Sequence, residues 1–169
     1  DFSVGTDSGG SLRVPASFCG VWGMRPTLHR ISEAGVIPFM PSVSTVGVVA
    51  ADLDILVRAM RVLLRSGKEP VHRLCRIVVL EDAFELADKP VRDAAKDAVV
   101  RLSEQAGIPV ERVHFSSLVG QDIDLFACNA SALRDLETLE FQNTVGNWIE
   151  NHVPKLGSSF SMAYGNVKS

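Results

Sequence analysis

Basic charge, cysteine and long apolar runs are all scarce in this sequence of 169 residues. The 17 Lys and Arg residues are outnumbered by 20 Asp and Glu residues, and the resulting net charge of −3 argues against binding to nucleic acid or to an anionic membrane. No stretch approaches the roughly 20 apolar residues of a membrane span. Three cysteines, Cys19, Cys75 and Cys128, are odd in number and far apart. This pattern fits reduced intracellular thiols better than a disulfide framework or a zinc site.

The two ends of the chain lack the features of natural termini. The first residues contain no initiator Met, no charged segment and no apolar segment of a targeting peptide. The last residues, 166–169, follow an apparent turn. We therefore expect the chain to be a piece of a longer protein, and without a visible targeting signal we expect that protein to be cytoplasmic.

What the sequence does contain is the composition of one folded domain. Hydrophobic residues make up 46% and charged residues 22%, as in chains that fold around a core. Glycine and proline are frequent in residues 1–50, which predicts short strands and tight turns, with one strand over 46–49. A helix should begin at Asp52 and end at Gly67. Its apolar residues recur every three or four positions and predict one buried face, made of Leu53, Leu56, Val57, Met60, Leu63 and Leu64.

Strand and helix patterns alternate in the rest of the chain. Residues 76–82 and 110–115 read as strands, and a helix with Pro90 in its first turn and Gly107 at its end lies between them. A third helix should run from about 131 to about 151. The predicted inward residues of these two helices are Val91, Ala94, Ala95, Ala98, Val99 and Leu102, then Leu133, Leu136, Leu139, Trp148 and Ile149. The predicted fold class is α/β, a mixed sheet flanked by helices, in a single domain over 1–169.

The segment that suggests chemistry runs from Gly5 to Pro15, with the sequence GTDSGGSLRVP. Its two adjacent glycines allow a sharp turn whose backbone N–H groups are unobstructed and could form an anion nest. The hydroxyl of Ser11, at the end of that nest, could attack a carbonyl while the N–H groups stabilise the oxyanion. A phosphate-binding Walker loop is excluded because Leu12 follows Ser11. A glycine-rich turn with solvent-facing serines remains the plain alternative.

Several motifs in one register resemble the amidase signature family. They are GTDSGGSLRVPA over 5–16, FCGVWGMRPT over 18–27, GVIP over 35–38 and STVG over 44–47. Within that family, DFSVGTD at the start, LEDAF over 80–84 and EFQN over 140–143 are similar to the plant-type indole-3-acetamide hydrolases and to amidase-like import receptors. The resemblance divides the expected domain into a signature region over 1–50 and a continuation over 51–169.

The resemblance implies a Ser–cis-Ser–Lys triad with Ser11 as the nucleophile. It assigns the oxyanion hole to the backbone N–H groups of Ser8, Gly9, Gly10 and Ser11, and it assigns to Asp7 and Arg13 the holding of the glycine loop. The cis-Ser and the Lys lie upstream of this motif in the family, whereas the first lysine here, Lys68, follows it. We therefore expect residues 1–169 alone to be inactive. No metal or organic cofactor is implied.

The implied activity is hydrolysis of a small-molecule carboxamide, such as indole-3-acetamide, to the carboxylic acid and ammonia through an acyl-enzyme. Two alternatives stay open: a glutamine amidotransferase component that supplies ammonia, and a non-catalytic receptor. Receptors of this type have typically lost the serine that is present here as Ser11. An apolar acyl pocket could be lined by Phe39, Met40, Phe126, Phe141 and Trp148, although core packing is the better explanation for most of these residues.

Overall fold

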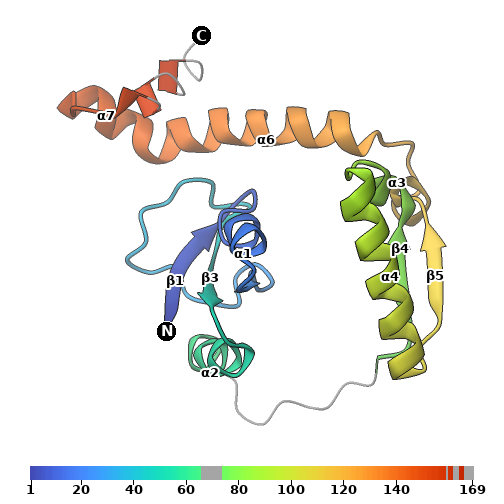
Figure 1. The fold of residues 1–169 in the computed structure, drawn as a ribbon. Helices are drawn as coiled ribbons and strands as arrows, with labels where there is room; N and C mark the ends of the chain where they lie inside the picture. The colour runs from blue at the N-terminus through green and yellow to red at the C-terminus, as the bar shows by residue number, and fades with distance from the viewer. Residues whose placement is uncertain (66–73, 159, 162–163, 166–169) are drawn as a thin grey trace. The chain divides into compact units, whose positions relative to one another are not determined.

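The computed structural model describes residues 1–65, 74–158, 160–161 and 164–165, and it confirms the α/β class. The chain forms two compact units, Asp1–Glu69 with Leu133–Ser169, and Pro70–Ala132 (Figure 1). In the described ranges, no helix is long and apolar enough to span a membrane. The side chains of all three cysteines are exposed.

A three-stranded antiparallel sheet is the centre of the first unit. Strand β3 (Thr45–Ala50) lies between β1 (Phe2–Asp7) and β2 (Trp22–Met24). The register places Asp7 opposite Thr45. Strand β3 contains the predicted strand over 46–49 and is buried along nearly its whole length. The end of β1 is thereby fixed against the most buried strand of the unit.

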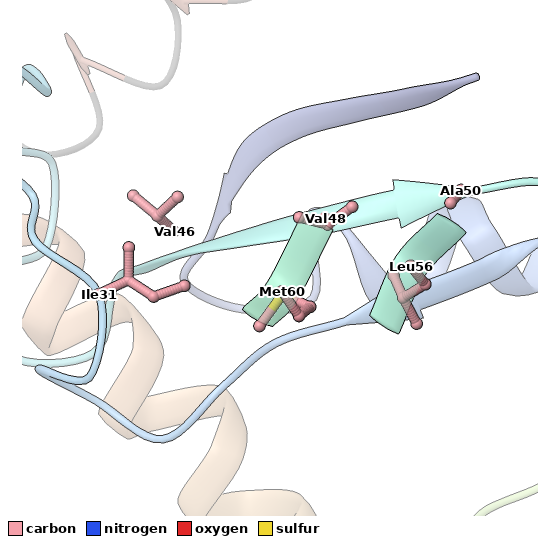
Figure 2. Close-up of a cluster of buried hydrophobic side chains, with 6 residues drawn as sticks. All are labelled: Ile31, Val46, Val48, Ala50, Leu56 and Met60. Carbon is pink, nitrogen blue, oxygen red and sulfur yellow. The ribbon is translucent and has the colours of Figure 1, made fainter. Parts of the chain in front are cut away.

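Helix α2 (Leu53–Leu63) covers one face of this sheet. Asp52 caps the helix as predicted, because its Oδ1 accepts hydrogen bonds from the N–H groups of residues 54 and 55 at 2.8 and 3.2 Å. The helix ends at Leu63, earlier than the predicted end at Gly67, which lies outside the described residues. Figure 2 shows the resulting core, made of Ile31, Val46, Val48, Ala50, Leu56 and Met60.

Two residues of the predicted α2 face do not join this core. Leu53 is 45% exposed and Val57 is 38% exposed, whereas Ile55 and Ala59 pack against the cluster. The face of α2 that packs on β3 contains Leu56 and Met60. The two exposed residues lie beside this face, toward solvent. Apolar spacing predicted the helix correctly, but it did not fix the rotation of the helix about its axis.

The opposite face of the sheet receives helix α1 (Arg13–Cys19), whose buried residues are few and small. A Cβ atom on Gly47 would lie 2.2 Å from the carbonyl oxygen of Met24 and 2.7 Å from Cδ1 of Leu12. A Cβ atom on Gly23 would lie 2.6 Å from Cβ of Ala16. The glycines of the sheet therefore let α1 approach closely. This approach also positions the loop that precedes α1.

The second unit is the predicted strand–helix–strand. Strands β4 (Ile77–Leu80) and β5 (Val110–Val113) pair in parallel, and α4 (Lys89–Ala106) connects them. Two short helices, α3 (Glu81–Glu85) and α5 (Phe115–Val119), follow the strands. Pro90 lies in the first turn of α4, and Gly107 ends the helix with a left-handed φ of 63°, as predicted.

The predicted inward face of α4 is wrong for most of its residues. Val91 and Leu102 are 62% and 50% exposed, Ala94 and Ala98 are exposed, and only Ala95 and Val99 are half-buried. The described part of this unit offers α4 only a two-stranded sheet, which is too narrow to cover a helix of 18 residues.

The third helix begins earlier than predicted and changes its winding. Helix α6 (Leu125–Phe141) continues through a π-helical turn, η1 (Gln142–Gly146), into α7 (Asn147–His152). The early start follows from a cap, because Asp124 Oδ1 accepts hydrogen bonds from the N–H groups of residues 126 and 127. Of the predicted core residues, Ile149 is buried and Leu136 is half-buried, whereas Leu139 and Trp148 are exposed. The side chain of Leu133 lies outside the described part.

Candidate active site

Asp7, at the end of β1, holds the glycine loop in shape. Its side chain is fully buried. Oδ1 accepts hydrogen bonds from Gly10 N at 2.9 Å and from Arg13 Nη2 at 2.9 Å. Oδ2 accepts from Leu12 N at 3.2 Å, and from Arg13 N and Nε at 3.3 and 3.0 Å. One carboxylate thus fixes the backbone on both sides of Ser11.

The hydrogen bonds of Asp7 keep it ionised. Burial raises the pKa of Asp7, but the side-chain hydrogen bond from Arg13 and the backbone N–H groups of Arg13, Leu12 and Gly10 lower that pKa to about 2. The hydrogen bond to Asp7 in turn raises the pKa of Arg13. Arg25 adds a second cation, with Nε 3.6 Å from Asp7 Oδ1, and also donates to the carbonyl oxygen of Asp7 at 3.3 Å.

Ser11 is exposed on this loop, directly before α1. The turn that presents Ser11 depends on Gly10, which has a φ of 127°. A Cβ atom on Gly10 would also lie 2.8 Å from Cγ2 of Val14. Among the described residues, the Ser11 hydroxyl has no hydrogen-bond partner. The structure therefore presents a serine whose hydroxyl is open to solvent on a rigid turn.

The four backbone donors predicted for the oxyanion hole have different surroundings. The N–H of Gly10 points inward to Asp7. Within the ranges that the structure covers, the N–H groups of Ser8, Gly9 and Ser11 meet no acceptor. The side chain of Ser8 forms a hydrogen bond of its own, because its Oγ lies 2.5 Å from Ser44 Oγ. Three backbone donors without an acceptor among the described residues thus lie on the loop that carries Ser11.

A cleft of about 370 Å³ opens over Ser11. Its other lining residues are Ser8, Gly9, Gly10, Val14, Pro15, Phe39, Met40 and Glu137. Two of the predicted acyl-pocket residues, Phe39 and Met40, lie here. Glu137 belongs to α6, and no local sequence pattern indicates that a residue 126 positions after Ser11 lines the same cleft.

A second groove, of about 580 Å³, shares Phe39 with the cleft. Phe141 and Trp148, also predicted for an acyl pocket, line this groove rather than the cleft. Phe126 lies in the second unit and is 69% exposed, so it lines neither. No group of His, Cys, Asp and Glu residues within the described part could hold a metal ion.

Comparisons with known proteins indicate the family of the chain. The model of the Amidase family matches residues 1–151. Amidase 1 of Arabidopsis thaliana is 30% identical over 95% of this chain and 43% of its own length. Translocon at the outer membrane of chloroplasts 64 of Pisum sativum is 29% identical over 95% of this chain and 30% of its own length.

Shorter and structural matches point to the same family. A mitochondrial glutamyl-tRNA(Gln) amidotransferase component of Candida albicans is 50% identical over 70 residues, which are 41% of this chain and 16% of the relative. A solved amidase structure has the same fold, with a TM-score of 0.74 and 22% identity over 96% of this chain and 36% of its own. The chain thus spans less than half the length of the relatives it matches. By the match of the family model over 1–151, this chain belongs to the amidase family.

Proposed function

We propose that the protein hydrolyses a simple carboxamide to a carboxylic acid and ammonia through an acyl-enzyme on Ser11. The observation that carries this proposal is the exposed Ser11 hydroxyl beside the unpaired N–H groups of Ser8, Gly9 and Ser11. The hydroxyl oxygen would attack the amide carbonyl carbon and lose its proton to a base, while the N–H groups hold the oxyanion. Ammonia would leave with a returned proton, and water would then cleave the ester.

The reaction needs a base, and we propose that this base is a lysine. A serine hydroxyl is a weak nucleophile until a base lies within hydrogen-bond reach. The cleft over Ser11 is lined by no lysine among the described residues. We propose that a Lys and a bridging cis-Ser come from a segment outside residues 1–169. The greater length of the relatives supports this proposal.

An aryl-acetamide such as indole-3-acetamide is the substrate we propose. Val14, Phe39 and Met40 give the cleft apolar walls. The neighbouring groove, with Phe141 and Trp148, offers aromatic surface beyond Phe39. The similarity to Amidase 1 over 95% of this chain agrees with a small amide substrate. We also propose a cytoplasmic location, which cell fractionation with an antibody to the protein would test.

Ammonia transfer within a larger complex is the second candidate function. The 50% identity to a glutamyl-tRNA(Gln) amidotransferase component over 70 residues favours it. A protein of this kind would release ammonia only with its partner proteins. The similarity to a chloroplast translocon component leaves a binding protein as a third candidate. The presence of Ser11 in an open cleft supports an enzyme over a binding protein.

The test is ammonia release from indole-3-acetamide by the full-length protein. We expect turnover that falls at least about 10³-fold in Ser11→Ala, since the nucleophile is lost. Ser17→Ala, which removes an exposed hydroxyl of α1 outside the cleft, should keep its activity. Turnover that survives in Ser11→Ala would contradict the proposal, and turnover that requires added partner proteins would favour the second candidate.

A further inference from the structure

Glu137 is the charged residue of the described cleft lining. The other lining residues are glycines, serines, a proline and apolar side chains. Glu137 is half-buried, and no hydrogen bond or ion pair to it is found in the part of the chain that the structure describes. An ionised carboxylate can only accept hydrogen bonds. The cleft therefore has one strong acceptor that no described residue of the chain uses.

The position of Glu137 is fixed by the next turns of the same helix. Glu140, one turn later, accepts a hydrogen bond from Ser42 N at 3.0 Å. The ring of Phe141 packs edge-on against Phe39 at a centroid distance of 5.4 Å. Residues three and four positions apart lie on one face of a helix. The face that carries Glu137 is thus held against the loop that carries Phe39.

The π-helical turn extends this attachment. Thr144 Oγ1, in η1, donates to the carbonyl oxygen of Phe39 at 3.4 Å. The loop held in this way continues to Ser44, whose hydroxyl lies 2.5 Å from that of Ser8. The helix that places Glu137 and the loop that places Ser11 are therefore connected by direct contacts. The backbone that carries Glu137 is therefore held beside the cleft, which places its carboxylate within reach of a bound ligand.

We propose that Glu137 selects amides whose acyl group carries a hydrogen-bond donor, such as the N–H of an indole ring. The inference rests on the proposed function in one respect, namely that the amide occupies the Ser11 cleft. An acyl group with a donor replaces the water around the carboxylate with a hydrogen bond. An acyl group without a donor displaces that water but forms no hydrogen bond to the carboxylate, so it binds more weakly. A negatively charged acyl group is disfavoured by like charge.

The test compares two ligands that differ in a single donor. Indole-3-acetamide and its 1-methyl analogue, in which N–CH₃ replaces N–H, are titrated into full-length Ser11→Ala protein by calorimetry, so that no turnover interferes. We expect indole-3-acetamide to bind at least about tenfold more tightly, as for a hydrogen bond to a charged group. In the Ser11→Ala, Glu137→Leu protein the ratio of the two dissociation constants should fall to about 1.

Two further variants separate hydrogen bonding from folding and from size. Glu137→Gln keeps an acceptor oxygen of the same shape, and its ratio should be intermediate. Asp135→Asn removes an exposed carboxylate of the same helix that does not line the cleft, and its ratio should match the parent's. Any of three results would overturn the inference. The two dissociation constants could be equal in the Ser11→Ala protein, neither amide could bind, or Glu137→Leu could leave the ratio of the constants unchanged.

The failure of this inference and of the proposed function can be told apart. Ammonia release by the protein with Ser11 present reports on hydrolysis, whereas the ratio of dissociation constants reports on Glu137. If the two amides bind equally tightly and ammonia is still released, Glu137 has no role in selection and the proposed hydrolysis stands. A ratio that depends on Glu137 without ammonia release would leave a binding site for amides and remove the hydrolysis.

Discussion

Asp7 and Arg13 form a two-point ion pair across the loop that carries Ser11, with Arg13 Nη2 2.9 Å from Oδ1 and Nε 3.0 Å from Oδ2. The backbone N–H of Arg13 also donates to Oδ2. The carboxylate is fully buried, while the guanidinium side chain is 52% exposed. The pair therefore stabilises the loop from its inner side and leaves the outer side of the loop open to a substrate.

Asp7→Asn should unfold the glycine loop more than it perturbs the sheet. The new side chain keeps one acceptor oxygen and turns its NH2 group either toward the N–H of Gly10 or toward the N–H groups of Leu12 and Arg13, which then lose their acceptor. We expect the free energy of unfolding to fall by about 2–4 kcal/mol and activity to be lost. Urea denaturation measures the first effect. Asp135→Asn, which alters an exposed carboxylate, should change neither quantity. Full activity in Asp7→Asn would contradict the role given to Asp7.

The stability contributed by Asp7 should disappear in acid. Its pKa is about 2 in the folded protein against a usual 3.8, so the unfolded state takes up the proton first as pH falls. The contribution, about 2 kcal/mol, is present in full above pH 5 and is lost between about pH 4 and pH 2. The difference in unfolding free energy between wild type and Asp7→Asn should shrink over that window. An NMR titration that gives Asp7 a pKa near 4 would contradict this expectation.

Gly47→Ala should be severely destabilising. Its Cβ would lie 2.2 Å from a carbonyl oxygen of β2, where the backbone cannot give way cheaply, and 2.7 Å from Leu12. We expect a loss of at least about 2 kcal/mol in the free energy of unfolding. Gly157→Ala is the matched control, because a Cβ there meets open space. Equal melting temperatures for the two variants would contradict the close approach of Met24 and Leu12 to Gly47.

Two threonines should respond oppositely to replacement by valine. Thr45 is 1% exposed, and its Oγ1 is buried without a hydrogen-bond partner among the described residues. Thr45→Val should leave stability unchanged or raise it by up to about 1 kcal/mol, since an unpaired hydroxyl is removed. Thr144→Val loses the hydrogen bonds to Phe39 and Phe141 and should cost about 1 kcal/mol. Thermal denaturation of both variants makes the comparison, and a large loss in Thr45→Val would reveal a partner for its hydroxyl.

Local signals in the sequence predicted the elements that local interactions define. Asp52 and Gly107 mark helix ends because capping depends on residues a few positions away. The adjacent glycines before Ser11 predicted the turn for the same reason. Helix α1 has such a signal only at its end, where Gly20 adopts a left-handed φ of 64°. Its seven residues include Pro15, and close packing on the glycines of the sheet stabilises it.

Contacts between distant residues were beyond what the sequence pattern could predict. The exposed face of α4 depends on what the sheet leaves uncovered, and the spacing of Val91 and Leu102 contains no information on this. Glu137 reaches the cleft because Ser42 and Phe39 hold α6, and each of those contacts joins residues about 100 positions apart. The turn that carries Ser11 was predictable from a motif, whereas the presence of Glu137 in the same cleft required the fold.

The central claim is that Ser11 is an activated nucleophile, and a covalent probe tests this most directly. The full-length protein is treated with a fluorophosphonate, digested, and searched for the adduct by mass spectrometry. We expect one adduct on Ser11, absent in Ser11→Ala and unaffected in Ser17→Ala. A folded protein that forms no adduct on Ser11 would contradict the claim and would leave a binding protein as the better description of this chain.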